Sequence, residues 1–164
     1  MPDAKGRISQ YITWNKTDGK FLQFTVPRGD AGDGVSSKKL LSTDYLSASN
    51  GVPIFSAKAR NLLVSVAADE VEFYECLISC EGQLHTFFLA KTLKYLPLVD
   101  KDRSTFEPLE GGGRILNDIQ YSPAEGLNFY LARDDEFCGR LLASEKFVGL
   151  CHAEGLDIDF IDAN

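Results

Sequence analysis

Carboxylates grouped in three short stretches are the side chains of this sequence best placed to do chemistry. The stretches lie at residues 69–75, 134–136 and 157–162. In the first and third, acids alternate with apolar residues, so an extended chain would carry the acids on one face and the apolar side chains on the other. Such a face is either a solvated surface or a docking surface for a basic partner. The candidate partner-binding residues are Glu70, Glu72, Asp157 and Asp159.

Catalysis by paired carboxylates is a third, less favoured interpretation, because no nucleophile, metal cluster or second base accompanies them. Gly111–Gly113 run into Arg114 and an apolar stretch, which predicts a hairpin turn rather than a phosphate-binding loop. Asp30 and Asp33 lack the alternating ligands and the final Glu of an EF-hand. We therefore expect no catalytic residues, no cofactor and no metal ion.

The cysteines and histidines also lack a catalytic or metal-binding arrangement. Cys151 and His152 are adjacent, and neighbours on a helix point about 100° apart, so they cannot form a nucleophile–base pair with each other. His85 could approach Cys151 in space, although an ordinary surface or strand position is the favoured interpretation. The cysteines do not have the spacing of a zinc site, and they are too few for a disulfide scaffold. They are therefore expected to be reduced and buried. They are Cys76, Cys80, Cys138 and Cys151.

Composition limits the partners and the compartment. The 164 residues, 44% of them hydrophobic, predict one globular domain over residues 1–164. A formal charge of −7 argues against nucleic acid and against an anionic membrane surface, and it leaves basic partners open. The N-terminus has no apolar signal core, and no apolar run is long enough to span a membrane. We therefore expect a cytoplasmic protein.

Helix and strand signals are strongest in the middle of the chain. Ser56 is a suitable N-cap for a helix over 57–67, whose apolar residues repeat at helical spacing. Residues 71–78 and 83–96 predict a hairpin that turns at Glu81-Gly82. Further strands are expected at 114–121 and 127–132, with a turn at 122–126 between them. In the N-terminal part, the sequence predicts a strand at 20–26, a loop at 28–37 and a short helix within 38–49.

The last segment resembles this central one. Ser144 precedes a helix of about ten residues, Gly155 is suited to the position after its C-terminus, and the sequence LDIDFID predicts a strand. This pattern indicates either two copies of a helix–strand unit or a chance similarity. The fold expected is α+β, with a mostly antiparallel sheet and two or three helices on one face. The predicted core is Phe55, Leu62, Leu63, Val71, Phe73, Phe88, Ile115, Phe129, Phe147, Leu150 and Phe160.

Three stretches together resemble a known family. They are VPIFSAKARNLLVSVAADEVEFYECLI (52–78), FFLAKTLKYLPLVDKDRSTFEPL (87–109) and LNFYLARDDEFCGRLLASEKFVGLCHAEGLDIDF (127–160). The pattern is similar to immunity family eleven of bacterial polymorphic toxin systems, formerly a domain of unknown function with a myxobacterial prototype. The resemblance covers residues 52–162 and leaves 1–50 unplaced. It implies an antitoxin that binds and neutralises a co-encoded toxin, without catalytic residues.

The residues and the resemblance are compatible, because an acidic inhibitor suits a basic toxin. We therefore expect an immunity protein whose partner is a cognate, basic protein toxin. The alternative is a small ligand-binding or enzymatic domain with a pocket between the two helix–strand units.

Overall fold

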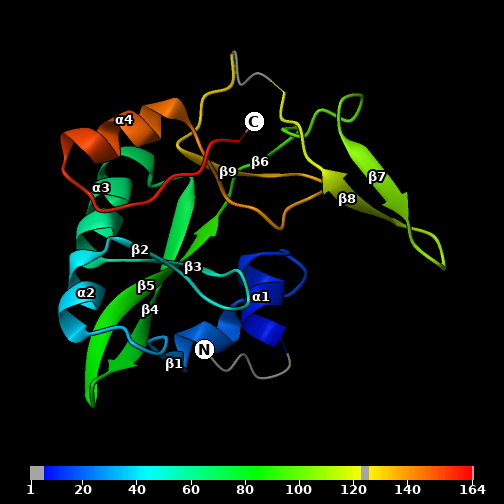
Figure 1. The fold of residues 1–164 in the computed structure, drawn as a ribbon. Helices are drawn as coiled ribbons and strands as arrows, with labels where there is room; N and C mark the ends of the chain where they lie inside the picture. Colours follow the sequence, from blue (N-terminus) through cyan, green and yellow to red (C-terminus); the bar gives the residue numbers. More distant parts are fainter. Residues whose placement is uncertain (1–5, 123–125, 164) are drawn as a thin grey trace.

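A curled five-stranded sheet lies at the centre of the computed structural model, which describes residues 6–122 and 126–163 (Figure 1). Its strands are β1 (Arg28–Asp30), β2 (Tyr45–Ser47), β3 (Pro53–Phe55), β4 (Val71–Cys80) and β5 (Gln83–Thr92). Their order in the sheet is β1-β4-β5-β3-β2. Only β1 with β4 is a parallel pair, and the other neighbours are antiparallel, so the expected α+β fold with a mostly antiparallel sheet is confirmed.

The β4–β5 hairpin is the longest element and matches its prediction closely. Its register runs unbroken from Val71 opposite Thr92 to Cys80 opposite Gln83. The two turn residues, Glu81 and Gly82, have φ values of 49° and 76°. Two positive φ values characterise the tight turn whose twist matches that of the flanking strands, and glycine adopts one of them without strain.

Helices cover both faces of this sheet. They are α1 (Arg7–Ile12), the 3₁₀ helix η2 (Lys20–Gln23), α2 (Ser37–Ser42), α3 (Ala57–Ala67) and α4 (Glu145–Ala153). The two long helices, α3 and α4, pack in one apolar cluster against the sheet face that carries Val71 and Phe73. This matches the expectation of two or three helices on one face. The short α1 and α2 add a second cluster on the opposite face, around Cys76 and Ile78. Alternation along β4 therefore supplies two cores rather than one.

Two smaller sheets complete the fold. One consists of β6 (Tyr95–Leu96), β9 (Leu131–Asp134) and β10 (Leu142–Ala143), in the order β10-β9-β6. The other is the hairpin of β7 (Thr105–Pro108) and β8 (Arg114–Asp118), which projects at the right of Figure 1. We call this hairpin, residues 105–118, the arm. The predicted strand at 114–121 is β8, the strand at 127–132 is shifted to β9, and the turn at 122–126 lies partly outside the described residues.

The two serine-capped helices form as predicted. The Ser56 side chain accepts a hydrogen bond from the Ala59 amide at 3.1 Å, and Ser144 accepts one from the Phe147 amide at 3.3 Å. Gly155 follows α4 with a φ of 62°, a conformation that glycine adopts without strain. The pattern of Ser cap and helix therefore specifies the same local structure twice.

The strand predicted at LDIDFID is wrong, and the repeat extends only over the caps and helices. Residues 156–163 form no strand and join no ladder. Their backbone is bonded near its start, where the Leu156 amide donates to the Cys151 carbonyl and Asp157 exchanges hydrogen bonds with Asp44. The strand that follows α3, in contrast, pairs with β1 and β5. Alternation of acids and apolar residues fixes which side faces inward, but a strand also requires a neighbouring backbone.

Predictions for the N-terminal third are largely wrong. The strand expected at 20–26 is η2 followed by irregular chain, and the loop expected at 28–37 contains β1 and the start of α2. The helix expected within 38–49 ends at Ser42, and β2 follows it. β1 is a three-residue edge strand whose pairing with Leu77–Ser79 comes from the tertiary fold. Short edge strands carry little signal in their own residues.

The predicted core is confirmed in the body of the fold and wrong in the arm. Ile115 on β8 is 48% exposed. The buried members are Phe55, Leu63, Val71, Phe129 and Phe147, and the half-buried members are Leu62, Phe73, Phe88, Leu150 and Phe160.

Candidate functional site

Glu70, expected on an exposed acidic face, is instead a buried structural residue with 6% exposure. Its Oε2 accepts hydrogen bonds from the amides of Tyr130 at 2.7 Å and Leu131 at 3.4 Å. These bonds tie the start of β4 to β9, which explains why a carboxylate is tolerated in this position. Its donors lie 60 residues further along the chain, so no local pattern in the sequence indicates them.

Glu72 is exposed, as expected, but its carboxylate is engaged on the α1 side of the sheet. It accepts hydrogen bonds from the hydroxyls of Tyr74 at 2.9 Å and Tyr11 at 3.1 Å, and these two hydroxyls lie 2.7 Å apart. Burial, followed by the bonds to Tyr11 and Glu72, raises the pKa of Tyr74. Glu72 therefore anchors α1 to β4 rather than standing free for a partner.

Asp157 and Asp159 are exposed on the C-terminal segment. Ile158 and Phe160, which alternate with them, pack toward the core. This alternation is as predicted. Asp157 lies beside α2, with its Oδ2 4.0 Å from Lys39 Nζ. Glu72 contacts α1, so the structure does not gather the four predicted acids on one face.

Asp44 is a buried acid that the sequence did not single out. Its Oδ2 accepts from the Asp157 amide at 2.9 Å, and its other oxygen accepts the Ser56 hydroxyl. Its backbone amide donates to the Asp157 carbonyl at 2.9 Å. Asp44 thus joins the N-cap of α3 to the C-terminal segment.

A hollow of about 430 Å³ lies next to Asp44, between the start of α3 and the chain that follows α4. We call it the cap hollow. Lys58 crosses its rim and donates to the Gly155 carbonyl at 2.7 Å. The residues lining it are Leu41, Ser42, Asp44, Ser56, Ala57, Lys58, Thr86, Phe87, Gly155 and Asp157.

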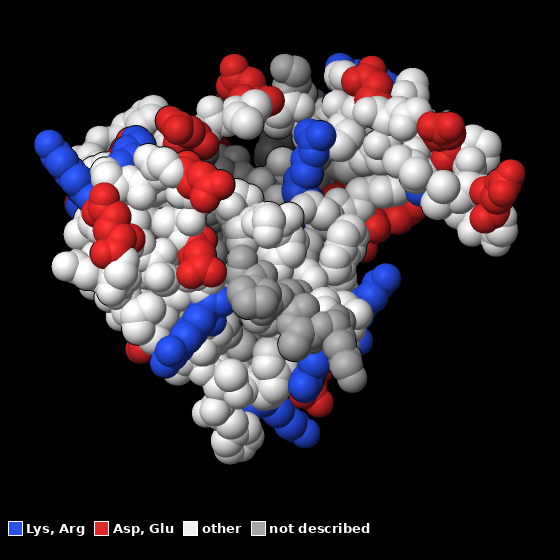
Figure 2. Space-filling view, turned by 60° about the horizontal axis from the view of Figure 1, so that its bottom comes forward, with Lys and Arg blue, Asp and Glu red and all other residues white. Residues whose placement is uncertain are grey.

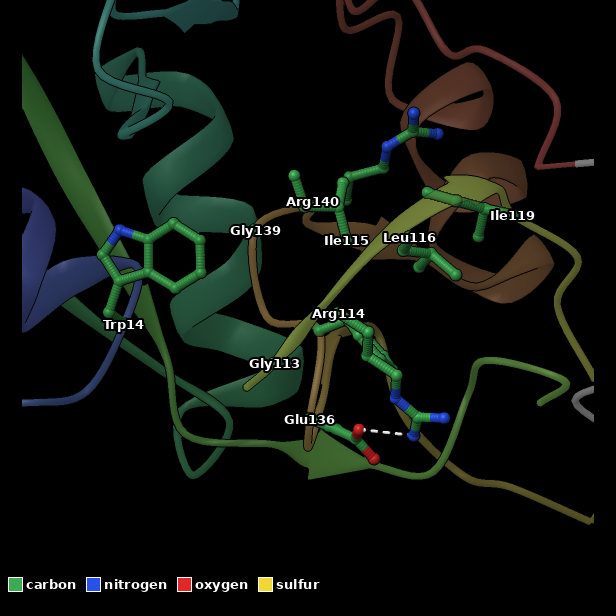
Figure 3. Close-up of a pocket in the computed structure, with 10 residues that line it drawn as sticks. Trp14, Gly113, Arg114, Ile115, Leu116, Ile119, Glu136, Gly139 and Arg140 are labelled. Carbon is green, nitrogen blue, oxygen red and sulfur yellow. Dashed lines mark hydrogen bonds and ion pairs between the residues drawn. The ribbon is translucent and has the colours of Figure 1, made fainter. Parts of the chain in front are cut away.

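A larger hollow of about 840 Å³ lies at the base of the arm. We call it the arm hollow. In Figure 3, Trp14 stands across the opening from Leu116 and Ile119 of the chain around β8, and the segment 136–140 forms a third wall. Trp14 is the only tryptophan of the chain and is 44% exposed. The residues lining the hollow are Trp14, Gly113, Arg114, Ile115, Leu116, Ile119, Glu136, Phe137, Gly139 and Arg140.

Glu136 holds the arm in place. Arg114 Nη2 lies 2.7 Å from one of its oxygens, and Lys101 Nζ lies 2.5 Å from the other (Figure 3 shows the first pair). Hydrogen bonds from Lys101 and then Arg114 lower the pKa of Glu136. The Arg114 guanidinium also lies 4.3 Å from the ring centre of Phe106, which contacts Phe137 at 5.5 Å.

Charge is unevenly distributed along the chain. Residues 1–60 carry nine Lys and Arg against five Asp and Glu, whereas residues 61–164 carry eight against nineteen. Figure 2 shows acidic side chains along the projecting arm at the right of the view. The arm hollow thus has a mainly apolar lining that includes Arg114 and Arg140, and it lies beside the acidic side chains of the arm. No local pattern in the sequence indicates this hollow, because its walls come from three separate segments.

The cysteines are free and buried, as predicted. Burial raises the pKa of Cys76 to about 12 and that of Cys151 to about 11, so both remain thiols at neutral pH. Within residues 6–122 and 126–163, no three His, Cys, Asp or Glu side chains are grouped as a metal site. Of the helices that the structure describes, none has both the length and the apolar character needed to cross a bilayer.

Comparison of the chain with models of protein families and with curated proteins gives no match.

Proposed function

We propose that this chain is an immunity protein that binds and neutralises a co-encoded protein toxin, and that the arm hollow is its docking surface. The observation that carries the proposal is the arm hollow itself, an open and mainly apolar surface with a half-exposed tryptophan. The resemblance of residues 52–162 to an immunity family points in the same direction.

The residue types of the arm hollow suit a protein partner. Tryptophan, tyrosine and arginine carry most of the binding energy at protein interfaces. Trp14, Arg114 and Arg140 all line the hollow, and Ile115 adds an apolar side chain that folding leaves exposed. The arm is fixed by the Glu136 contacts before any partner arrives, which lowers the entropic cost of association.

The charge distribution favours a basic partner. Residues 61–164 carry nineteen acids against eight bases, so this part of the molecule would attract a basic toxin over long range. Such attraction mainly raises the association rate and discriminates against acidic partners, while the apolar and aromatic contacts set the lifetime of the complex. We place this binding in the cytoplasm and assign no catalytic step to the chain.

The experiment that tests the proposal is rescue of the toxicity of the neighbouring gene product, combined with a measured Kd. We expect the double variant Trp14→Ala/Ile115→Ala to fold normally but to bind about 100-fold more weakly and to lose rescue. Leu84→Ala is the matched control, because Leu84 is 54% exposed on the distant end of the hairpin. Full rescue and unchanged affinity in the double variant would reject the arm hollow as the docking surface.

The second candidate function is a small ligand-binding or enzymatic domain, and the cap hollow is the observation that favours it. This hollow lies between the two serine-capped units and carries Lys58, Asp44 and Asp157 at its walls. Ala57 lines the cap hollow and is exposed at the start of α3, so the larger side chain of Ala57→Trp would fill the hollow. The arm would remain intact. If Ala57→Trp abolishes the biological activity while the arm variants do not, the cap hollow is the functional site.

A further inference from the structure

The largest fully buried side chain of the described residues is an arginine. Arg133 lies on β9 with 1% exposure. Its Nη1 donates to the Cys138 carbonyl at 2.7 Å, but its Nε and Nη2 have no hydrogen-bond partner. A guanidinium carries five N–H groups, so most of the donors of this buried cation are unused.

A second unpaired polar atom lies beside it. Tyr95 stands opposite Arg133 in the parallel register of β6 and β9, so the two side chains leave the sheet on the same side. The buried Tyr95 hydroxyl has no partner either. Burial raises the pKa of Tyr95, so the phenol keeps its proton and remains a donor. Two cross-strand neighbours on the same side of this sheet therefore both carry unused donors.

Among the residues that the structure describes, no carboxylate forms an ion pair with Arg133. Desolvation lowers the pKa of Arg133, and the groups that oppose this effect are Tyr95, Cys138 and Tyr45, none of them a carboxylate. The neighbouring Asp134 accepts four backbone N–H groups, from Leu98, Val99, Glu136 and Phe137, and its oxygens are thereby occupied.

A buried charge is normally stabilised by an opposite charge as well as by hydrogen bonds. A water molecule would satisfy the donors but leave the charge unneutralised. We propose that Arg133 and Tyr95 bind a halide ion, which is a monatomic anion and accepts hydrogen bonds from several donors at once. This inference is independent of toxin binding.

Crystals of the wild-type protein grown in bromide test the site directly. We expect an anomalous bromine peak within hydrogen-bonding distance of Arg133 Nε or Nη2 and of the Tyr95 hydroxyl. Density for water alone at this position, with bromide present elsewhere or nowhere, would overturn the proposal.

Thermal unfolding provides a second test in solution. At constant ionic strength, replacing gluconate by chloride should raise the unfolding midpoint of the wild type by roughly 3–6 °C once chloride exceeds its Kd several-fold. Arg133→Met and Tyr95→Phe should lose most of this rise. Arg60→Met is the control, because Arg60 is partly exposed on α3 and bonded to Asn61. An equal chloride response in all four proteins would overturn the proposal.

Discussion

The body of the fold and the arm hold their shapes in different ways. In the body, the centre of the sheet and α3 bury residues such as Leu63 and Leu89 completely. In the arm, every residue of β7 and β8 is half-buried or exposed. The arm is held by the ion pair of Arg114 with Glu136 and by the Phe106–Phe137 contact, and Lys101 outside the arm pairs with the other Glu136 oxygen.

This difference separates folding from binding. Apolar residues of the body exclude water from three buried clusters, and changing them should change stability. Ile115 and Trp14 remain substantially exposed, so folding gains little from them. Apolar surface that the fold leaves open next to a rigid scaffold is typical of a binding site. The predictions below follow from this separation.

The largest effect is expected in the body. Phe55 is almost fully buried between the sheet and α3, so Phe55→Ala should lower the free energy of unfolding by about 3–5 kcal/mol. Ile115→Ala in the arm should cost less than about 0.5 kcal/mol, because the side chain is half-exposed. Urea denaturation measures both. Equal losses would show that the arm belongs to the cooperative core.

Loss of the buried carboxylate should have a smaller effect. Glu70→Ala leaves the amides of Tyr130 and Leu131 without their acceptor, so we expect a loss of about 1–3 kcal/mol. The exposed Asp159→Asn serves as the control and should leave stability unchanged. If Glu70→Ala leaves the free energy of unfolding unchanged in urea denaturation, Glu70 has no structural role and is an ordinary surface acid.

The serine caps come next in size. Ser56→Ala and Ser144→Ala should each cost about 0.5–2 kcal/mol, because each removes the acceptor of an early helix amide. Ser56→Ala should cost more, since Ser56 also bonds to the buried Asp44. A larger cost at Ser144, in calorimetric unfolding of both variants, would contradict the role given to Asp44.

The correct predictions concern features that neighbouring residues determine. The wrong ones concern features that depend on residues far away in the chain. Ser56, Ser144 and the Glu81-Gly82 turn act through neighbouring residues, and all three form as expected. β1, the missing strand at 156–162 and the burial of Glu70 depend on partners far away in the chain. The arm hollow is the extreme case, because Trp14 and Ile115 are about a hundred residues apart and meet only in the fold.

The smallest effect concerns the attachment of the arm at different pH. Glu136 has a lowered pKa, so its contribution is present above the ordinary carboxyl range and is lost as the pH falls through the lowered value. Lys101 has a raised pKa, so its contribution is lost as the pH rises through that value. NMR signals of Phe137 and Ile115 should therefore shift at both extremes. Glu136→Gln should remove the acidic transition and leave the signals of β4 unchanged.

We propose that the arm hollow, and not the acidic C-terminal segment, contacts the toxin. Hydrogen exchange of the chain with and without the neighbouring gene product tests it most directly. We predict protection of residues 105–119 and 136–140 and of the backbone around Trp14, with no change at the Glu81-Gly82 turn. A stable complex that protects residues 154–162 and leaves the arm unchanged would contradict the account.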